Sequence, residues 1–550
     1  MKSWLNRNSS FLLIAGLICL YILSVLLNLG FLNLRIEESR RAIISMEMLH
    51  SGNYIGPHTL GWEYYNKPPV FNWILAGFIK MAGSDSEFVL RIPSLISLLI
   101  LGVCHYFISR RYLPGGIAAL SAFFMVTSAD LYFYTLSNGA EIDVFYSLIV
   151  YLQAISMFWF FEKKNYTLLF LSSWSLCAIG FLTKGYPSLV FQALTLIALC
   201  IHARSFKIIF KPQQFAGIGL FLILTGSYYY TYSRYSNPSV PLINLLNESL
   251  LKSAVGKEST GKMHRVLTYP LVLFRVLAPW CLLLLVLVKK QKIRLWDNSL
   301  VKFSALFILL NIGVYWITGA QKTRYIIMFI PFAMTIISYV YFQAEKQAPE
   351  KFNHYLKYAG LFFCIILIGL LALPLFSDVS WWSTLGFATL LLVFLIIFFR
   401  IQQYRIWLFI TGFILVRLIY AAIGIPVKEQ GEFDYEELAK GIVSKSNAQQ
   451  IYYWGYPDTL NMNVVAGDTL IKWTDKSVEI IPFFIRYQMP YYFYRVTGSL
   501  VKFDTVMEAG KTYISYGPYL KNKGIEPIDS FYDNQFRNWL IVFKAKPKPE

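Results

Sequence analysis

Charged residues are scarce in this chain of 550 residues. Asp, Glu, Lys and Arg together make up 15% of it, whereas an ordinary soluble domain carries about 25%. The apolar residues AVILMFWYC make up 56%, and the mean hydropathy is +0.49. This balance excludes a disordered, collagen-like or coiled-coil chain, and it argues against a wholly soluble enzyme.

Motifs for disulfides, metals and nucleotides are also missing. The six cysteines lie inside apolar runs without a C-x-x-C spacing, so we interpret them as packing residues. The six histidines show no H-x-x-x-H or H-x-x-E spacing, which argues against a zinc site. No G-x-G-x-x-G or Walker sequence is present, so no nucleotide site is indicated. We therefore expect no cofactor; a divalent metal is compatible with the chemistry discussed below but is not indicated.

Long apolar runs dominate the chain instead. A helix needs about 20 apolar residues to cross a hydrocarbon core of about 30 Å. The shorter run at 69–82 predicts an interfacial or re-entrant helix. We interpret the first long run as an uncleaved span, because it is too long for a signal peptide. We predict thirteen spans, at residues 9–30, 92–109, 115–134, 142–161, 167–183, 186–203, 214–231, 267–288, 299–317, 325–343, 356–375, 381–399 and 406–425.

The loops between these spans predict their orientation. With the N-terminus in the cytoplasm, eighteen Lys and Arg residues fall in inside loops, and three (Lys184, Lys322 and Arg324) fall in short outside loops. This asymmetry is the one that the positive-inside rule requires. Because the number of spans is odd, residues 427–550 are expected on the opposite side from the N-terminus.

The last part of the chain has a different composition. From Lys428 onward there are 15 basic and 15 acidic residues, so the net charge of +19 comes from residues 1–426. Because this surplus lies in membrane loops rather than on a polar domain, nucleic acid is a poor candidate partner. The pattern predicts a helix in FDYEELAKGIVSK and strands in QQIYYWG, SVEIIPFFIRYQM, YYFYRVTG, KTYISYG and NWLIVFKA. We therefore predict an all-α polytopic membrane domain, residues 1–426, followed by an extracytoplasmic C-terminal α/β domain, residues 427–550.

Polar residues gather in the loops predicted to lie at the outer face. Two of these loops are long, at 31–91 and 232–266. Transporters instead carry their polar residues within the spans, near the midplane. The placement therefore predicts chemistry at the outer interface rather than passage through the membrane. The residues concerned are Glu37, Glu38, Arg40, Arg41, Lys67, Glu141, Asp143, Lys184, His264, Lys322 and Arg324.

These residue types suit the transfer of a group away from a phosphate. A carboxylate can act as general base toward an acceptor hydroxyl. Lys and Arg can hold a phosphate and neutralise the charge that develops on it as it leaves. Glu37 and Glu38 follow the first span directly, and Asp143 opens the fourth. A purely structural alternative is that Glu37 and Glu38 form interfacial salt bridges with Arg40 and Arg41.

The first long loop contains the segment ESRRAIISMEMLHSGNYIGPHTLGWEYYNKPPVFNWI. This segment resembles the first outer loop of the lipid-linked-sugar glycosyltransferases of the GT-C fold. The most similar branch is that of the lipid A 4-amino-4-deoxy-L-arabinose transferases, with the protein O-mannosyltransferases as cousins. Further segments resemble the family in the same order along the chain, namely GAEIDVFYSL, GFLTKGYPSLV, LAPW and GAQKTRYIIMFIPFAM. The resemblance covers roughly residues 1–425, and the branch also has thirteen spans with an outside C-terminal α/β domain.

The resemblance implies a role for each matching residue. Glu37 stands where the family has its catalytic Asp, Glu38 matches a second acid, and Asp143 matches the acid at the start of the fourth span. Glu37 carries one methylene more than Asp, so either Glu37 or Asp143 could be the main base. The matching basic residues, which would hold the donor phosphate, are Lys67, Arg40, Lys184, Lys322 and Arg324; Tyr325 and Glu141 lie beside them.

Three further positions qualify this assignment. His264 could contact an acceptor or be a hydrogen-bonding residue at the interface. Arg275 lies inside the eighth span, where it could contact a phosphate or lipid headgroup or extend its side chain to the interface. Asn66 stands where some family members have an acid before Lys-Pro, which argues against a metal there.

Together these features predict a glycosyltransferase of the bacterial inner membrane with a cytoplasmic N-terminus and a periplasmic C-terminal domain. The resemblance implies a polyprenyl (undecaprenyl) monophosphate sugar as donor, inversion at the sugar carbon, and transfer of an aminoarabinose-type sugar to lipid A. One alternative keeps this donor class but uses a protein or a surface glycan as acceptor. Another, from a different class, is a lipid-linked-sugar flippase that interacts with membrane lipids without catalysis.

Overall fold

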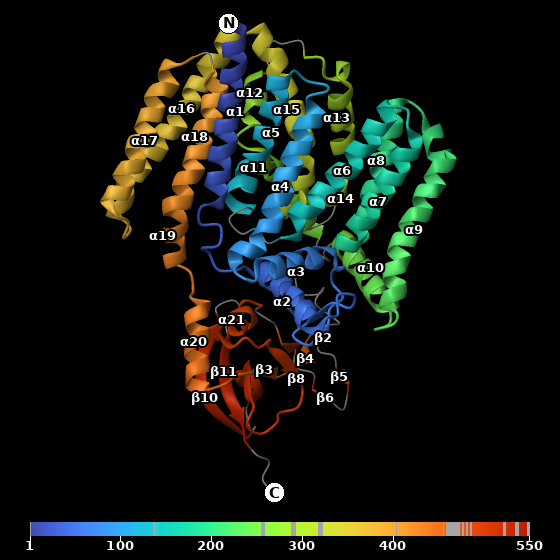
Figure 1. Ribbon diagram of the computed structural model, residues 1–550, viewed down its shortest axis with the longest axis vertical. Coiled ribbons are helices and arrows are strands. Elements are labelled where there is room, and N and C mark those ends of the chain that lie inside the picture. The colour runs from blue at the N-terminus through green and yellow to red at the C-terminus, as the bar shows by residue number, and fades with distance from the viewer. Residues whose placement is uncertain are drawn as a thin grey trace.

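The structure is a computed structural model. It describes residues 2–135, 139, 141–254, 259–287, 293–316, 323–402, 404–454, 456–457, 474–475, 478–479, 482–483, 487–520, 524–533 and 538–546. Its longest dimension runs from the N-terminal end of a helical bundle to a C-terminal unit that contains a sheet (Figure 1).

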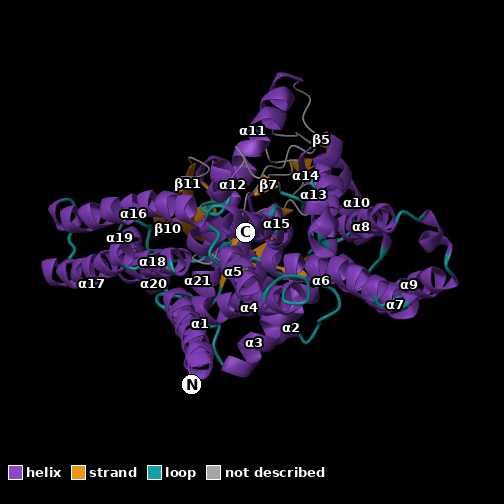
Figure 2. Cartoon of the chain, turned by 90° about the horizontal axis from the view of Figure 1, so that it is seen from above, coloured by secondary structure: helices purple, strands orange, loops and turns teal. Residues whose placement is uncertain are grey.

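Most of the helices lie along this long dimension, with two flanking groups beside a central one (Figures 1 and 2). Helices α16 and α17 project on one side, and α7, α8 and α9 lie on the other. The helices of the bundle are α1 (Lys2–Leu26), α4 (Glu87–Ser109), α5 (Gly115–Val126), α6 (Ile142–Glu162), α7 (Tyr166–Lys184), α8 (Pro187–Ala203), α9 (Pro212–Tyr232), α10 (Ser239–Ala254), α11 (Ser259–Leu277), α12 (Leu282–Leu287), α13 (Ser299–Asn311), α14 (Gly313–Trp316), α15 (Ile330–Gln347), α16 (Pro349–Ala372), α17 (Trp381–Arg400), α18 (Arg405–Ile419) and α19 (Ile425–Gln430).

Eight helical segments within the described residues are long and apolar enough to cross a membrane. They are Glu87–Ser109, Ile142–Glu162, Tyr166–Lys184, Ser299–Trp316, Ile327–Gln347, Phe352–Leu375, Trp381–Arg400 and Arg405–Gln430. The chain is therefore a multi-pass membrane protein, as its composition predicts. The remaining predicted spans fall on shorter or more polar helices (α1, α5, α8, α9 and α11), so the count of thirteen stays a prediction.

The first long loop folds into two helices that lie between the bundle and the C-terminal unit (Figure 1). They are α2 (Ile36–Ser51) and α3 (Val70–Ala82), with a short hairpin of β1 (His58–Thr59) and β2 (Trp62–Glu63) between them. At 13 residues, α3 is too short to span a bilayer. It corresponds to the short apolar run at 69–82.

A buried ion pair attaches α2 to α4. The Glu38 carboxylate receives hydrogen bonds from Arg91 at 3.0 and 3.2 Å and from the backbone N–H of Arg35 at 2.8 Å. Arg91 also donates to the carbonyls of Leu29 and Asn33, so it binds the chain on both sides of the turn after α1. The Glu38 and Arg91 side chains are fully buried. This pair sets where α2 begins relative to the spans.

The C-terminal unit contains a mixed sheet with the strand order β10-β11-β9-β3-β8. Strands β10, β11 and β9 are antiparallel, whereas β3 runs parallel to both β9 and β8. Helices α20 (Tyr435–Ser446) and α21 (Gln488–Thr497) accompany the strands. The strands are β3 (Ile451–Trp454), β4 (Tyr456–Pro457), β5 (Thr474–Asp475), β6 (Val478–Glu479), β7 (Pro482–Phe483), β8 (Lys502–Asp504), β9 (Thr512–Tyr516), β10 (Ile525–Asp533) and β11 (Asn538–Ala545).

The prediction of a helix in FDYEELAKGIVSK is confirmed by α20, whose first turn is capped by the Asp434 carboxylate. Strands β3, β9 and β11 confirm three of the predicted strands. The prediction of a strand in YYFYRVTG is wrong, because these residues belong to α21. Tertiary contacts override their β propensity: the hydroxyl of Tyr491 donates to the carbonyl of Asp85, that of Tyr492 bonds Glu87, and Gly498 ends the helix at φ 70°.

One hydrophobic core joins the first loop to the C-terminal unit. Residues of α2 and α3 pack in the same cluster as residues of α20, α21 and the sheet. Members of this cluster from both parts include Ala42, Ile43, Met46, Phe71, Leu75, Ala439, Ile442, Ile451, Met489, Phe493, Ile514 and Val542. The segment Arg405–Gln430 is continuous through residue 426, so a domain division at that position stays a prediction.

The buried pair of Glu38 and Arg91 leads to a stability prediction. Replacing Arg91 with Met leaves the Glu38 carboxylate buried without its cation, which costs about 3–5 kcal/mol of the free energy of unfolding. Thermal unfolding of the purified protein should show a large loss of stability for Arg91→Met. The double variant Glu38→Gln with Arg91→Met should recover much of it, and equal instability of the two variants would contradict this account.

Candidate active site

The site begins on the first turn of α2. The Arg40 guanidinium forms an ion pair with the Glu37 carboxylate, so the structural alternative for Glu37 is realised in this conformation. Glu37 remains 38% exposed. Desolvation raises the pKa of Glu37, but Arg40, Arg41 and Arg324 outweigh it and hold the pKa below its usual value. Glu37 is therefore an ionised and accessible carboxylate at neutral pH.

Arg324 connects three carboxylates that come from two distant parts of the chain. It lies in the short 3-10 turn Thr323–Tyr325. Its Nη1 atom lies 2.9 Å from Glu141 Oε1, its Nε 3.5 Å from Asp143 Oδ2, and its Nη2 3.9 Å from Glu37 Oε1. Glu141 and Asp143 flank the start of α6. The turn before α15 therefore meets the starts of α2 and α6 at one point.

Lys184 completes the group from the last residue of α7. Its ammonium pairs with the Asp143 carboxylate and lies over the rings of Tyr146 (4.8 Å) and Tyr325 (4.5 Å). The chain turns at Gly185, whose φ of 84° favours glycine. Lys184 and Asp143 are both buried, so each needs the other to offset the cost of desolvation.

The group is balanced in charge but not fully satisfied. Three carboxylates (Glu37, Glu141 and Asp143) face Arg40, Lys184 and Arg324. Desolvation raises the pKa of Glu141 to about 7; Arg324 opposes this rise, and Asp143 adds to it. The Nε atoms of Arg40 and Arg324 are buried and have no hydrogen-bond acceptor among the described residues. Buried N–H donors of this kind suit an anion.

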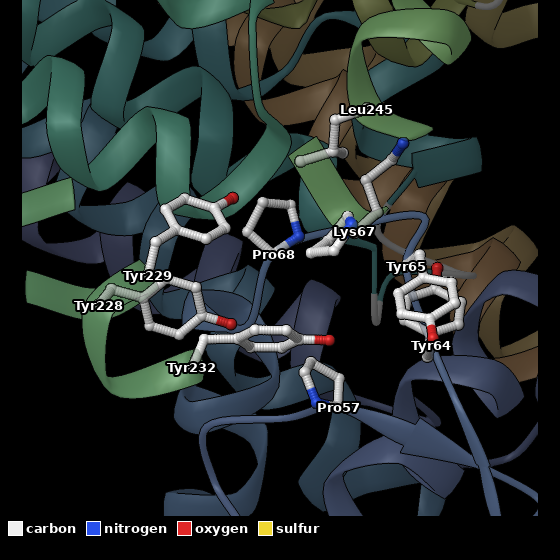
Figure 3. A pocket seen from close by; sticks show the side chains of 10 residues that line it. Pro57, Tyr64, Tyr65, Lys67, Pro68, Tyr228, Tyr229, Tyr232 and Leu245 are labelled. Atoms are coloured by element: carbon white, nitrogen blue, oxygen red, sulfur yellow. The ribbon is translucent and has the colours of Figure 1, made fainter. Parts of the chain in front are cut away.

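Lys67 lies in a neighbouring pocket with tyrosine walls (Figure 3). Its ammonium lies 2.6 and 2.7 Å from the two carboxylate oxygens of Glu248 on α10 and donates to the carbonyl of Asn66 at 2.9 Å. Tyr64 connects this pocket to α2, because its hydroxyl lies 2.5 Å from Arg41 NH2. The lining residues are Pro57, Tyr64, Tyr65, Lys67, Pro68, Tyr228, Tyr229, Tyr232, Pro241 and Leu245.

The structure brings most of the predicted residues together. Seven of them form the group around Arg324, namely Glu37, Arg40, Glu141, Asp143, Lys184, Arg324 and Tyr325. Glu38 is instead held in the buried pair with Arg91, which makes it a structural residue of α2. Arg275 pairs with Asp130 at 2.8 Å. Lys322 and the side chain of His264 lie outside the described residues.

Two residues of the site were missed by sequence reasoning. Glu248 carries no motif, and the helix that presents it to Lys67 comes from a different loop. Tyr487 belongs to the C-terminal unit, yet its ring lies 5.5 Å from the Arg40 guanidinium carbon. The density of charges in the first loop indicated a site there. It did not indicate which residues from other parts of the chain contact that loop.

Across the part of the chain that the structure describes, no group of three or more His, Cys, Asp or Glu side chains is placed to hold a metal ion. Asn66 bonds the side chain of Asn244 at 3.1 Å. The arrangement here is one of ion pairs between carboxylates and basic side chains.

The spans, the charged group at one end and the unit with a sheet beyond it define a polytopic membrane protein with the fold that the motifs implied. The crystal structure of ArnT from Cupriavidus metallidurans bound to undecaprenyl phosphate has this fold. The two chains superpose with a TM-score of 0.64 at 14% identity, over 98% of this chain and 99% of that one. The predicted architecture is therefore confirmed, while the number of spans stays open.

Sequence comparisons point in the same direction. Residues 66–230 match the family model described as dolichyl-phosphate-mannose-protein mannosyltransferase. The chain is 29% identical over 222 residues to the undecaprenyl phosphate-alpha-4-amino-4-deoxy-L-arabinose arabinosyl transferase of Edwardsiella ictaluri. The matched region covers 38% of this chain and 39% of that relative. The chain is 25% identical over 363 residues to a transferase of the same name from Pseudomonas fluorescens, covering 64% and 60%. The resemblance drawn from the motifs is confirmed.

Proposed function

We propose that this protein is a membrane glycosyltransferase that moves a sugar from a polyprenyl monophosphate donor to an acceptor outside the cytoplasm. An aminoarabinose-type sugar is the first candidate for the transferred group, and lipid A is the first candidate for the acceptor. The named activities of the similar transferases support this choice, as does the undecaprenyl phosphate in the ArnT crystal structure. The donor class follows from chemistry that the site can perform.

The observation that carries the proposal is the group of ions around Arg324. It joins a partly exposed carboxylate, Glu37, to the buried Nε–H donors of Arg40 and Arg324, neither of which makes a hydrogen bond within the described residues. A phosphate at these donors would be neutralised as it leaves, and a carboxylate beside it could accept the proton of the acceptor hydroxyl. A flippase needs no base, and a transporter would carry its polar residues within the spans rather than at one interface.

In the proposed reaction the acceptor oxygen attacks the anomeric carbon of the sugar, and the bond from that carbon to the phosphate oxygen breaks. The polyprenyl phosphate leaves with the bonding electrons, stabilised by Lys67, Arg40 and Arg324. Glu37 takes the acceptor proton. Asp143 is less suited to this role, since it is 4% exposed and paired with Lys184 and Arg324. We assign Asp143 to positioning these two cations.

The proposed location is a bacterial inner membrane, with the N-terminus in the cytoplasm and the C-terminal unit in the periplasm. We retain residues 1–426 as the membrane domain and 427–550 as the periplasmic one. The charge asymmetry of the loops supports this orientation, because the basic residues are concentrated on the side of the N-terminus. The acceptor would reach the site from the periplasmic side, where α2, α3 and the C-terminal unit meet.

Glycosyl transfer can be tested with purified protein, a pool of polyprenyl-phosphate sugars and lipid A. We expect a gain in the mass of lipid A equal to an aminopentose. Lys67→Ala should abolish it by weakening donor binding, and Glu37→Gln should lower the rate at least about a hundredfold while the donor still binds. Donor consumption with a peptide or glycan but not with lipid A would move the acceptor elsewhere. If the donor is not consumed with any acceptor, the flippase is favoured. Full activity in both Lys67→Ala and Glu37→Gln would contradict the site assignment.

The titration of Glu141 predicts a pH dependence. Below a pKa of about 7 its carboxyl is protonated; above it, the carboxylate competes with the donor phosphate for Arg324. The donor is a phosphodiester that does not titrate in this range, so its KM should rise up to about tenfold between pH 6 and pH 8. Steady-state kinetics of Glu141→Gln should show a flatter profile, and an unchanged profile would exclude Glu141 as its origin.

The orientation predicts the behaviour of reporter fusions. Alkaline phosphatase is active only outside the cytoplasm, so a fusion after residue 550 should be active in cells. A fusion in the loop at 204–211, which carries Arg204, Lys207 and Lys211, should be inactive because the charge rule places it inside. The reverse pattern would overturn the proposed topology.

A further inference from the structure

Helix α10 lies against the wall of the Lys67 pocket, and one of its faces makes the contacts. Pro241 and Leu245 line the pocket, Asn244 bonds Asn66, and Glu248 grips the Lys67 ammonium. The spacing of three, four and seven residues puts these side chains on one side of the helix. Leu245 also packs against Gly185, next to Lys184. A single helix face therefore contacts the elements that carry both lysines.

The contact between Glu248 and Lys67 is close and largely buried. Both carboxylate oxygens lie within 2.7 Å of the ammonium, and the two side chains are 10% and 17% exposed. A carboxylate in this position presents two oxygens to the cation much as a phosphate does. A lipid phosphate cannot form a full ion pair with the Lys67 ammonium while the Glu248 carboxylate is bound to that ammonium.

We propose that Glu248 is a product-release residue that competes with the lipid phosphate for Lys67; this rests on the donor class proposed above. The donor enters as a phosphodiester with one negative charge. The leaving polyprenyl phosphate is a monoester, which carries about 1.5 to 2 negative charges near pH 7. Lys67 consequently binds the product more tightly than the donor.

Without a competitor, this difference would slow turnover by retaining the product. The Glu248 carboxylate returns to Lys67 as the product phosphate leaves, so that the ammonium is never left without a partner in a desolvated pocket. Donor binding reverses the exchange. Glu248 thus lowers the affinity of the protein for both the donor and the product. The effect on turnover comes mainly from faster release of the product, which is the more highly charged of the two.

The test is direct binding of undecaprenyl phosphate to the full-length protein in detergent. Glu248→Gln keeps the size of the side chain but removes the charge, and we expect it to bind the product about tenfold more tightly than wild type. Glu248→Asp keeps the charge and should bind nearly as wild type does. Lys67→Ala should bind weakly, and adding Glu248→Gln to it should change nothing further.

Glu63→Gln is the matched control. Glu63 lies in the same loop and accepts hydrogen bonds from the hydroxyls of Tyr65 and Ser236, so its removal deletes a nearby charge that does not hold Lys67. The affinity of the Glu63→Gln variant for undecaprenyl phosphate should stay within about twofold of that of wild type. An equal gain in Glu63→Gln and Glu248→Gln would show a general electrostatic effect and overturn the proposal, as would no gain in Glu248→Gln.

Kinetics separate release from chemistry. Glu248→Gln should keep the single-turnover rate of wild type, and its steady-state kcat should fall several-fold after an initial burst of product. Loss of the single-turnover rate would show that Glu248 acts in the transfer itself and overturn the release role. If wild type and Lys67→Ala bind undecaprenyl phosphate equally, the phosphate site at Lys67 is wrong independently of Glu248, whereas the proposed function itself fails only if no donor is consumed with any acceptor.

Discussion

A charge at the edge of the hydrocarbon region is costly unless an opposite charge lies beside it. This constraint organises the end of the bundle that faces the C-terminal unit. Arg324 meets Glu37, Glu141 and Asp143, and Lys184 meets Asp143. The starts of α2 and α6, the end of α7 and the turn before α15 are therefore brought to one point by their charges. The geometry of the proposed site follows from the same neutralisation of charge.

The eight long apolar spans and the density of charges in the first loop were predictable because both depend on local pattern. Hydropathy identifies a span wherever about 20 apolar residues follow one another. The first loop stands out by its unusual density of acidic and basic residues. The pairing of those charges was not predictable, because it depends on helices far apart in the sequence. Glu38 has Arg40 and Arg41 as near neighbours in the chain, yet its partner is Arg91 on α4.

The C-terminal unit shows the same limit in its secondary structure. Alternating apolar strands such as β9 and β11 could be predicted, since their pattern is local. Helix α21 could not be predicted, because its aromatic residues favour a strand in isolation. They are helical here in contact with His50 of α2 and with Asp85 and Glu87 at the start of α4. Tyr487, which immediately precedes α21, lies against the Arg40 guanidinium. The C-terminal unit therefore contributes a residue to the proposed site.

The core shared by the first loop and the C-terminal unit reverses the usual order of assembly. Most domains fold as they leave the ribosome, N-terminal parts first. In the proposed topology α2 and α3 cross the membrane early, but Ala42, Phe71 and Leu75 pack against residues of α20, α21 and the sheet, which are synthesised later. On this view the loop that carries Glu37 and Lys67 reaches its final packing only after the C-terminal unit has been made, so the proposed site is incomplete while the spans are being inserted.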